Sequence, residues 1–117
     1  MATVKDFLAR VNTIEGVGGC LLVKDDGHIL AHLVDGPADY SSLIAICSKQ
    51  ALAIMETSGF SFFRSLSFAQ SKGQGLHIFP LQQYYLGVIQ QPGYPVEKVI
   101  SQVNHLLSHV KAGSSKK

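Results

Sequence analysis

Five histidines and two cysteines are the side chains of this 117-residue chain best suited to metal or nucleophilic chemistry. His28 and His32 fall on one face of a predicted strand, but four residues along a strand span about 13 Å, too far for both imidazoles to bind one metal ion. His105 and His109 lie one helical turn apart, yet no acidic residue or third ligand follows them at a matching spacing. The pattern favours plain histidines near a helix C-terminus over a metal site.

The two cysteines, Cys20 and Cys47, lie within apolar runs and have no second thiol or histidine at metal-ligand spacing. Cysteines in such surroundings behave as small, reduced core residues. A nucleophilic site would require the fold to bring His77 or His32 beside Cys47 or a carboxylate. Nothing in the spacing of these residues indicates that arrangement.

Two further motifs have structural explanations. Asp25 and Asp26 are consecutive residues of a predicted tight turn, where neighbouring side chains point apart and serve turn chemistry instead of acid–base catalysis. Gly16, Gly18 and Gly19 precede a predicted strand and no Lys-Ser/Thr pair follows them, so they do not form a phosphate-binding loop. The sequence therefore predicts no enzyme, no cofactor and no metal.

Composition limits the kinds of partner. Charged residues make up 15% of the chain, against about 25% in an average soluble domain, which indicates surface hidden against another molecule. The net charge is +2, and Lys116 and Lys117 belong to the C-terminal tail, so the folded part is near neutral and nucleic acid is not expected. The absence of a long apolar run or a secretory signal predicts a cytoplasmic protein without membrane insertion.

Periodicity and turn residues predict eight elements that position these side chains. They are a helix at 3–13, strands at 20–23 and 29–34, a long helix led by a capping Asp39 and ending at Gly59, strands at 62–69, 76–79 and 84–89, and a last helix at 96–110.

The hairpin connections imply a five-stranded antiparallel sheet. Because the first and fifth strands are apolar on both faces, helices should cover both sides, which gives a three-layer α/β (α+β) sandwich. Residues 1–111 are predicted to form a single domain and residues 112–117 a flexible tail.

Three features together resemble the Roadblock family. They are the run IEGVGGCLLVKDDGHILA at 14–31, the apolar helix led by Asp39, and the apolar strand YLGVI at 85–89. The family includes dynein light chains, bacterial polarity regulators that act on a Ras-like GTPase, and scaffolds that carry Rag GTPases. The resemblance covers about residues 3–110 and implies a profilin-like fold that dimerises by pairing its third strands and packing its second helices side by side.

Two features of the chain fit such a dimer independently. The predicted second helix is apolar over more than one stripe, and the predicted third strand has one face of small residues. An unpaired strand edge would otherwise favour aggregation. The residues predicted to form the dimer interface are Ile46, Gln50, Ala53, Ile54, Phe62, Arg64, Ser65 and Leu66.

The leading functional hypothesis is a non-catalytic homodimer that binds and modulates a small Ras-like GTPase or a larger motor or signalling assembly. An alternative is a small-molecule sensor that holds a ligand between sheet and helix, for which a pocket above about 300 Å³ is expected. An enzyme is the third hypothesis and requires the histidine cluster described above.

Overall fold

The computed structural model describes residues 4–61, 63–69 and 73–114 and contains the eight predicted elements in the predicted order. They are α1 (Val4–Asn12), β1 (Val17–Lys24), β2 (Ile29–Leu33), α2 (Pro37–Ser58), β3 (Leu66–Ala69), β4 (Gly75–Leu81), β5 (Tyr84–Gln90) and α3 (Val96–Ser114).

The five strands form one antiparallel sheet in the order β2-β1-β5-β4-β3. The first and last strands of the chain, β1 and β5, therefore lie side by side in the interior of the sheet, where Leu21 of β1 is opposite Gly87 of β5. The two sheet edges are β2 and β3. In the β1–β2 turn, the Asp26 carboxylate accepts a hydrogen bond of 2.9 Å from the backbone N–H of His28, which lowers the pKa of Asp26. This contact supports the structural interpretation of that turn.

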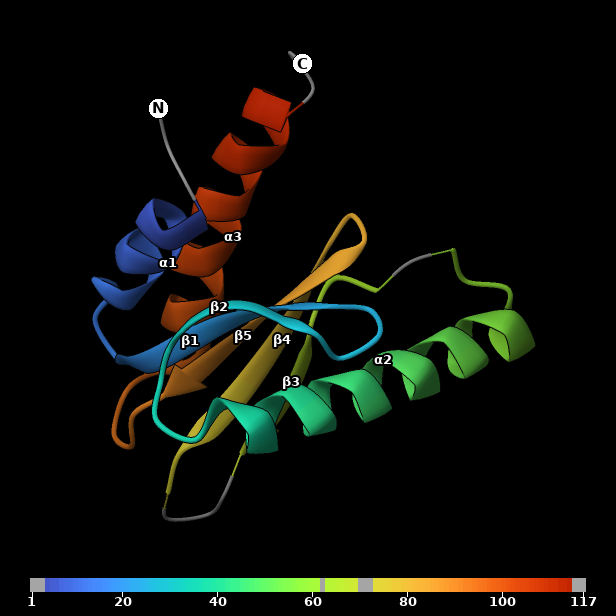
Figure 1. Cartoon of the computed structure of the whole chain (residues 1–117), viewed down its shortest axis with the longest axis horizontal. Helices are drawn as coiled ribbons and strands as arrows, with labels where there is room; N and C mark the ends of the chain where they lie inside the picture. The colour runs from blue at the N-terminus through green and yellow to red at the C-terminus, as the bar shows by residue number, and fades with distance from the viewer. Residues whose placement is uncertain (1–3, 62, 70–72, 115–117) are drawn as a thin grey trace.

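Helices cover both faces of the sheet, as the sequence predicts (Figure 1). On one face α1 and α3 pack against the sheet, and on the other face α2 does. The α1/α3 side of the core consists of Leu8, Val11, Val17, Cys20, Leu22, Phe79, Leu81, Leu86, Val88, Val99, Val103 and Leu107. The α2 side consists of Leu21, Val23, Ile44, Cys47, Leu76, Ile78, Tyr85 and Ile89.

A glycine at the centre of β5 lets α2 approach the sheet closely. A Cβ added at Gly87 would lie 2.7 Å from the terminal methyl groups of both Ile44 and Leu21. Those two side chains are fully buried and have little room to move. The missing side chain at Gly87 therefore sets the spacing between α2 and the sheet.

The structure departs from the predicted elements at several places. β1 begins at Val17 instead of Cys20, so Gly18 and Gly19 lie within the strand and not before it. Asp39 does not cap α2, because the helix begins with Pro37 in its first turn after Gly36, whose φ of 64° is left-handed. The third strand begins only at Leu66, and Phe62 lies outside the described residues. The last helix continues to Ser114, beyond the predicted end at 110. No helix of the described chain is long and apolar enough to span a membrane.

Candidate functional sites

The cysteines lie in buried surroundings that disfavour the thiolate form. Both are reduced and buried, and the thiol of Cys20 donates a hydrogen bond of 3.3 Å to the carbonyl of Leu8. Burial raises the pKa of Cys20 to about 12 and raises that of Cys47 as well. Since the thiolate is the reactive form, neither residue is activated.

The histidines are dispersed over the fold. His28 precedes β2, His32 lies exposed in β2, His77 is buried in β4, and His105 is exposed on α3. Across residues 4–61, 63–69 and 73–114, no group of three histidine, cysteine, aspartate or glutamate side chains gathers at metal-binding distance.

A buried chain of hydrogen bonds around His77 links three strands to the segment before α3. Ser67 Oγ lies 2.7 Å from His77 Nδ1, and His77 Nε2 lies 2.6 Å from Gln90 Oε1. The amide nitrogen of Gln90 donates to the carbonyl of Tyr94 at 2.7 Å. His77 is 1% exposed and Gln90 is 5% exposed. Sequence spacing did not indicate this chain, because its members are neighbours only through the strand register.

The direction of each bond in this chain follows from the amide of Gln90. Its nitrogen is used by Tyr94, so its oxygen accepts from His77 Nε2–H, and Nδ1 is left to accept the hydroxyl proton of Ser67. Ser67, His77 and Gln90 follow the order of a catalytic serine triad, in which an imidazole lies between a hydroxyl and an orienting group. Here, however, the neutral amide of Gln90 takes the place of the carboxylate that would stabilise an imidazolium. We interpret the chain as a structural connection between β3 and the start of α3.

The outer face of α2 exposes an unusual number of apolar side chains. Four residues predicted for the dimer interface, Ile46, Gln50, Ala53 and Ile54, recur at helical spacing and all are exposed. Ile46 is 58% and Ile54 is 61% exposed. Leu43, which sequence reasoning missed, extends the same stripe by one turn. We call these five residues the α2 stripe.

The other predicted interface residues lie before or at the start of β3. Arg64 is exposed and Ser65 is half-buried, and both precede the strand. Leu66 is the first residue of β3, and its side chain packs against the α2 side of the core. Further exposed aromatic surface comes from Phe68, 49% exposed within β3, and from Phe60, 70% exposed after α2. The structure therefore brings an apolar helix face and an edge strand to the same side of the molecule.

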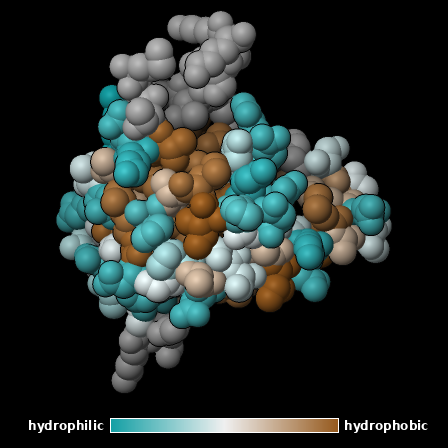
Figure 2. Space-filling model, in the orientation of Figure 1, coloured by the Kyte–Doolittle hydropathy of each residue, from teal (hydrophilic) through white to brown (hydrophobic). Residues whose placement is uncertain are grey.

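The surface view agrees with this distribution. Figure 2 shows apolar groups exposed over α2, at the lower right, and again over the middle of the molecule around β2. On the other edge strand, β2, Leu30 and Leu33 are 44% and 43% exposed.

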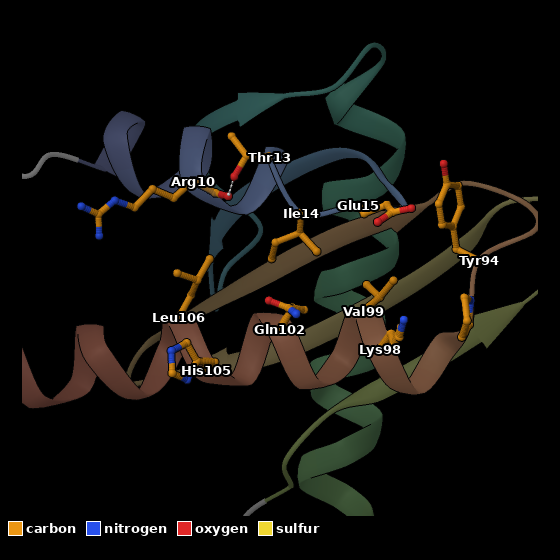
Figure 3. A pocket seen from close by; sticks show the side chains of 11 residues that line it. Arg10, Thr13, Ile14, Glu15, Tyr94, Lys98, Val99, Gln102, His105 and Leu106 are labelled. Atoms are coloured by element: carbon orange, nitrogen blue, oxygen red, sulfur yellow. Dashed lines mark hydrogen bonds between the residues drawn. The ribbon is translucent and has the colours of Figure 1, made fainter.

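A groove of about 560 Å³ runs between the C-terminal end of α1 and the first turns of α3 (Figure 3). Its apolar lining comes from Ile14, Val99 and Leu106. Polar side chains surround that lining: Arg10, Thr13, Glu15, Tyr94, Lys98, Gln102 and His105. Tyr94 lines this groove, whereas Tyr85 stacks on Phe63 in the α2 side of the core at a ring-centroid distance of 6.2 Å.

No family model matches the sequence, and no curated protein sequence does either. Solved structures do match. MglB of Myxococcus xanthus superposes with a TM-score of 0.84 at 13% identity, over 99% of this chain and 100% of that one. A Roadblock/LC7 domain from Streptomyces avermitilis gives 0.81 at 11% identity, over 97% and 99%. Profilin IB of Acanthamoeba castellanii gives 0.71 at 14% identity, over 96% and 99%. The predicted profilin-like Roadblock fold is thereby confirmed.

Proposed function

We propose that this chain is a single-domain, non-catalytic regulatory module that forms a homodimer and binds a small Ras-like GTPase. The observation that carries the proposal is the exposed α2 stripe together with the open edge of β3, whose Leu66 packs on the α2 side of the core. In the Roadblock resemblance described above, these two elements form the dimer interface. The proposal assigns the same role to Ile46, Gln50, Ala53, Ile54, Arg64, Ser65 and Leu66, and to Phe62.

Physical chemistry supports a partner at this surface. Monomeric proteins rarely expose large contiguous apolar patches, because such patches promote association. The stripe combines Leu43, Ile46 and Ile54, each more than 40% exposed, on one side of a single helix. The charged residues Lys49 and Glu56 of α2 flank the stripe, since each lies about one helical turn from Ala53. A second copy would bury the stripe and pair the open edge of β3 in one contact.

The GTPase partner follows from the resemblance. A dimer can regulate such a partner without chemistry of its own if it contacts one nucleotide state more favourably and thereby shifts the population of that state. Arg10 and Arg64 are the only arginines in the chain. Arg64 belongs to the proposed interface and Arg10 borders the groove, so we propose regulation by differential binding instead of by a catalytic arginine.

The experiment compares wild type with Ala53→Arg, which places a charge at an exposed position in the middle of the stripe. Binding to Ras-like GTPases from the same genome is measured by calorimetry, with GDP or a non-hydrolysable GTP analogue bound. We expect wild type to bind one nucleotide state more tightly and the variant, a folded monomer, to bind weakly. Equal binding of both states, or no binding to any of these GTPases, contradicts the proposed regulation.

A further inference from the structure

The groove between α1 and α3 is bordered by charged side chains. Arg10, Glu15 and Lys98 all border it, and none of the three forms an ion pair within the described part of the chain. Figure 3 shows Arg10 at one end of the groove and Glu15 at the other end, beside Tyr94, with Lys98 opposite on α3. In a chain with 15% charged residues, two cations and one carboxylate around one groove are a local concentration of charge.

Several contacts fix the position of Tyr94, which forms one wall of the groove. The ring of Tyr94 packs directly on Gly16, where an added Cβ would lie 2.9 Å from Tyr94 Cγ and where φ is +96°. The carbonyl of Gly16 accepts a 2.7 Å hydrogen bond from the N–H of Gln91. The side-chain nitrogen of Gln90 donates a hydrogen bond to the carbonyl of Tyr94, and the side-chain oxygen of Gln90 accepts one from the buried His77. Such preorganisation lowers the entropy that a ligand must overcome on binding.

We propose that this groove binds an organic anion with a flat apolar body. The volume of about 560 Å³ lies within the range of small-molecule sites, about 300–1,000 Å³. Ile14, Val99 and Leu106 supply apolar contact, and the fixed ring of Tyr94 supplies a surface for stacking. The anionic group pairs with Lys98 or Arg10, the two cationic side chains of the lining.

The balance of charge selects an anion over a cation. The lining side chains include two cationic residues, Arg10 and Lys98, and one carboxylate, Glu15. Glu15 and the hydroxyl of Tyr94 then serve as acceptor and donor for polar substituents at the far end of the ligand. The site does not depend on the proposed dimer, because α2 covers the opposite face of the sheet.

Three probes that share one ring system test the proposal: 2-naphthoate, 2-naphthamide and 2-naphthylmethylammonium. Each is titrated into the full chain and followed by backbone amide shifts in two-dimensional NMR. We expect 2-naphthoate to bind most tightly, with the largest shifts at Ile14, Tyr94, Val99 and Gln102. Lys98→Glu should weaken its binding by about tenfold, whereas Lys49→Glu, a charge reversal at an exposed site on α2, should leave it unchanged.

Four results would overturn the proposal. One is equal affinity for the acid and the amide, which would leave only apolar contact. Another is a set of shifts centred on the α2 stripe instead of the groove. The third is no saturable shift at millimolar probe, and the fourth is equal weakening by Lys49→Glu and Lys98→Glu. Because Lys98 is an exposed helix residue, the variant should fold, and an unchanged amide spectrum outside the groove verifies this.

Discussion

Replacing Ile54 with alanine should weaken dimerisation by a calculable amount. Ile54 is 61% exposed in the isolated chain, and full burial of an isoleucine side chain contributes about 1.5–3 kcal/mol. Burying the exposed part therefore contributes about 1–2 kcal/mol per protomer, or about 2–4 kcal/mol for the two copies in a dimer. The dimer Kd should rise by about 30- to 700-fold. The stability of the folded monomer should hardly change, because most of the side chain is in water.

Analytical ultracentrifugation over a range of concentrations measures this Kd. Leu52→Ala is the matched control, because Leu52 is 52% exposed on the same helix but lies off the α2 stripe. The control should dimerise as wild type does. If Ile54→Ala changes Kd by less than threefold, or if Leu52→Ala weakens the dimer as much, the assignment of the interface to the α2 stripe is refuted.

Three further predictions concern the core. Gly87→Ala should destabilise the fold by about 1–3 kcal/mol in chemical denaturation, because its methyl group would press on the buried Ile44 and Leu21; an unchanged or increased stability would contradict the close approach of α2. His77→Phe should lower the free energy of unfolding by about 1–3 kcal/mol, because Gln90 loses its buried hydrogen-bond partner. Ser67→Ala should have a smaller effect, because Ser67 is the exposed end of this series of hydrogen bonds. Cys20, with its pKa raised to about 12, should resist alkylation by iodoacetamide at pH 8 until the protein unfolds, and rapid alkylation of the native protein would contradict this prediction. Because the pKa of Cys20 is higher in the folded than in the unfolded protein, its contribution to stability should be lost as pH rises from about 9 towards 12.

The sequence predicted the order of elements because each is marked by local features. The Asp-Gly turn at 26–27 and the glycines at 16–19 define the first hairpin, and the apolar run at 85–89 defines the central strand. The error at Asp39 has a local cause: Gly36 adopts a left-handed conformation that places Pro37 at the start of the helix, and Pro37 is itself a favourable first residue. The late start of β3 is not visible in the alternating pattern of 62–69, because alternation does not reveal where strand pairing begins.

The sites were predictable to different degrees. The α2 stripe was indicated by an excess of apolar residues around one helix, although Leu43 was missed. The hydrogen-bond chain of His77 could not be predicted, because Ser67, His77 and Gln90 meet only in the register of β3, β4 and β5. The groove depends on how α1 packs beside α3, and no spacing in the sequence describes that distance. Both unpredicted features arise from contacts between different secondary-structure elements.

The solution mass of the wild-type chain tests the proposed dimer most directly. Light scattering at micromolar concentration should give twice the chain mass of 12.6 kDa, and the mass should fall towards that of one chain for Ala53→Arg while the far-ultraviolet circular dichroism stays the same. A wild-type protein that remains at the mass of one chain across the micromolar range would contradict the account, because the α2 stripe and the β3 edge would then have no second copy to cover them.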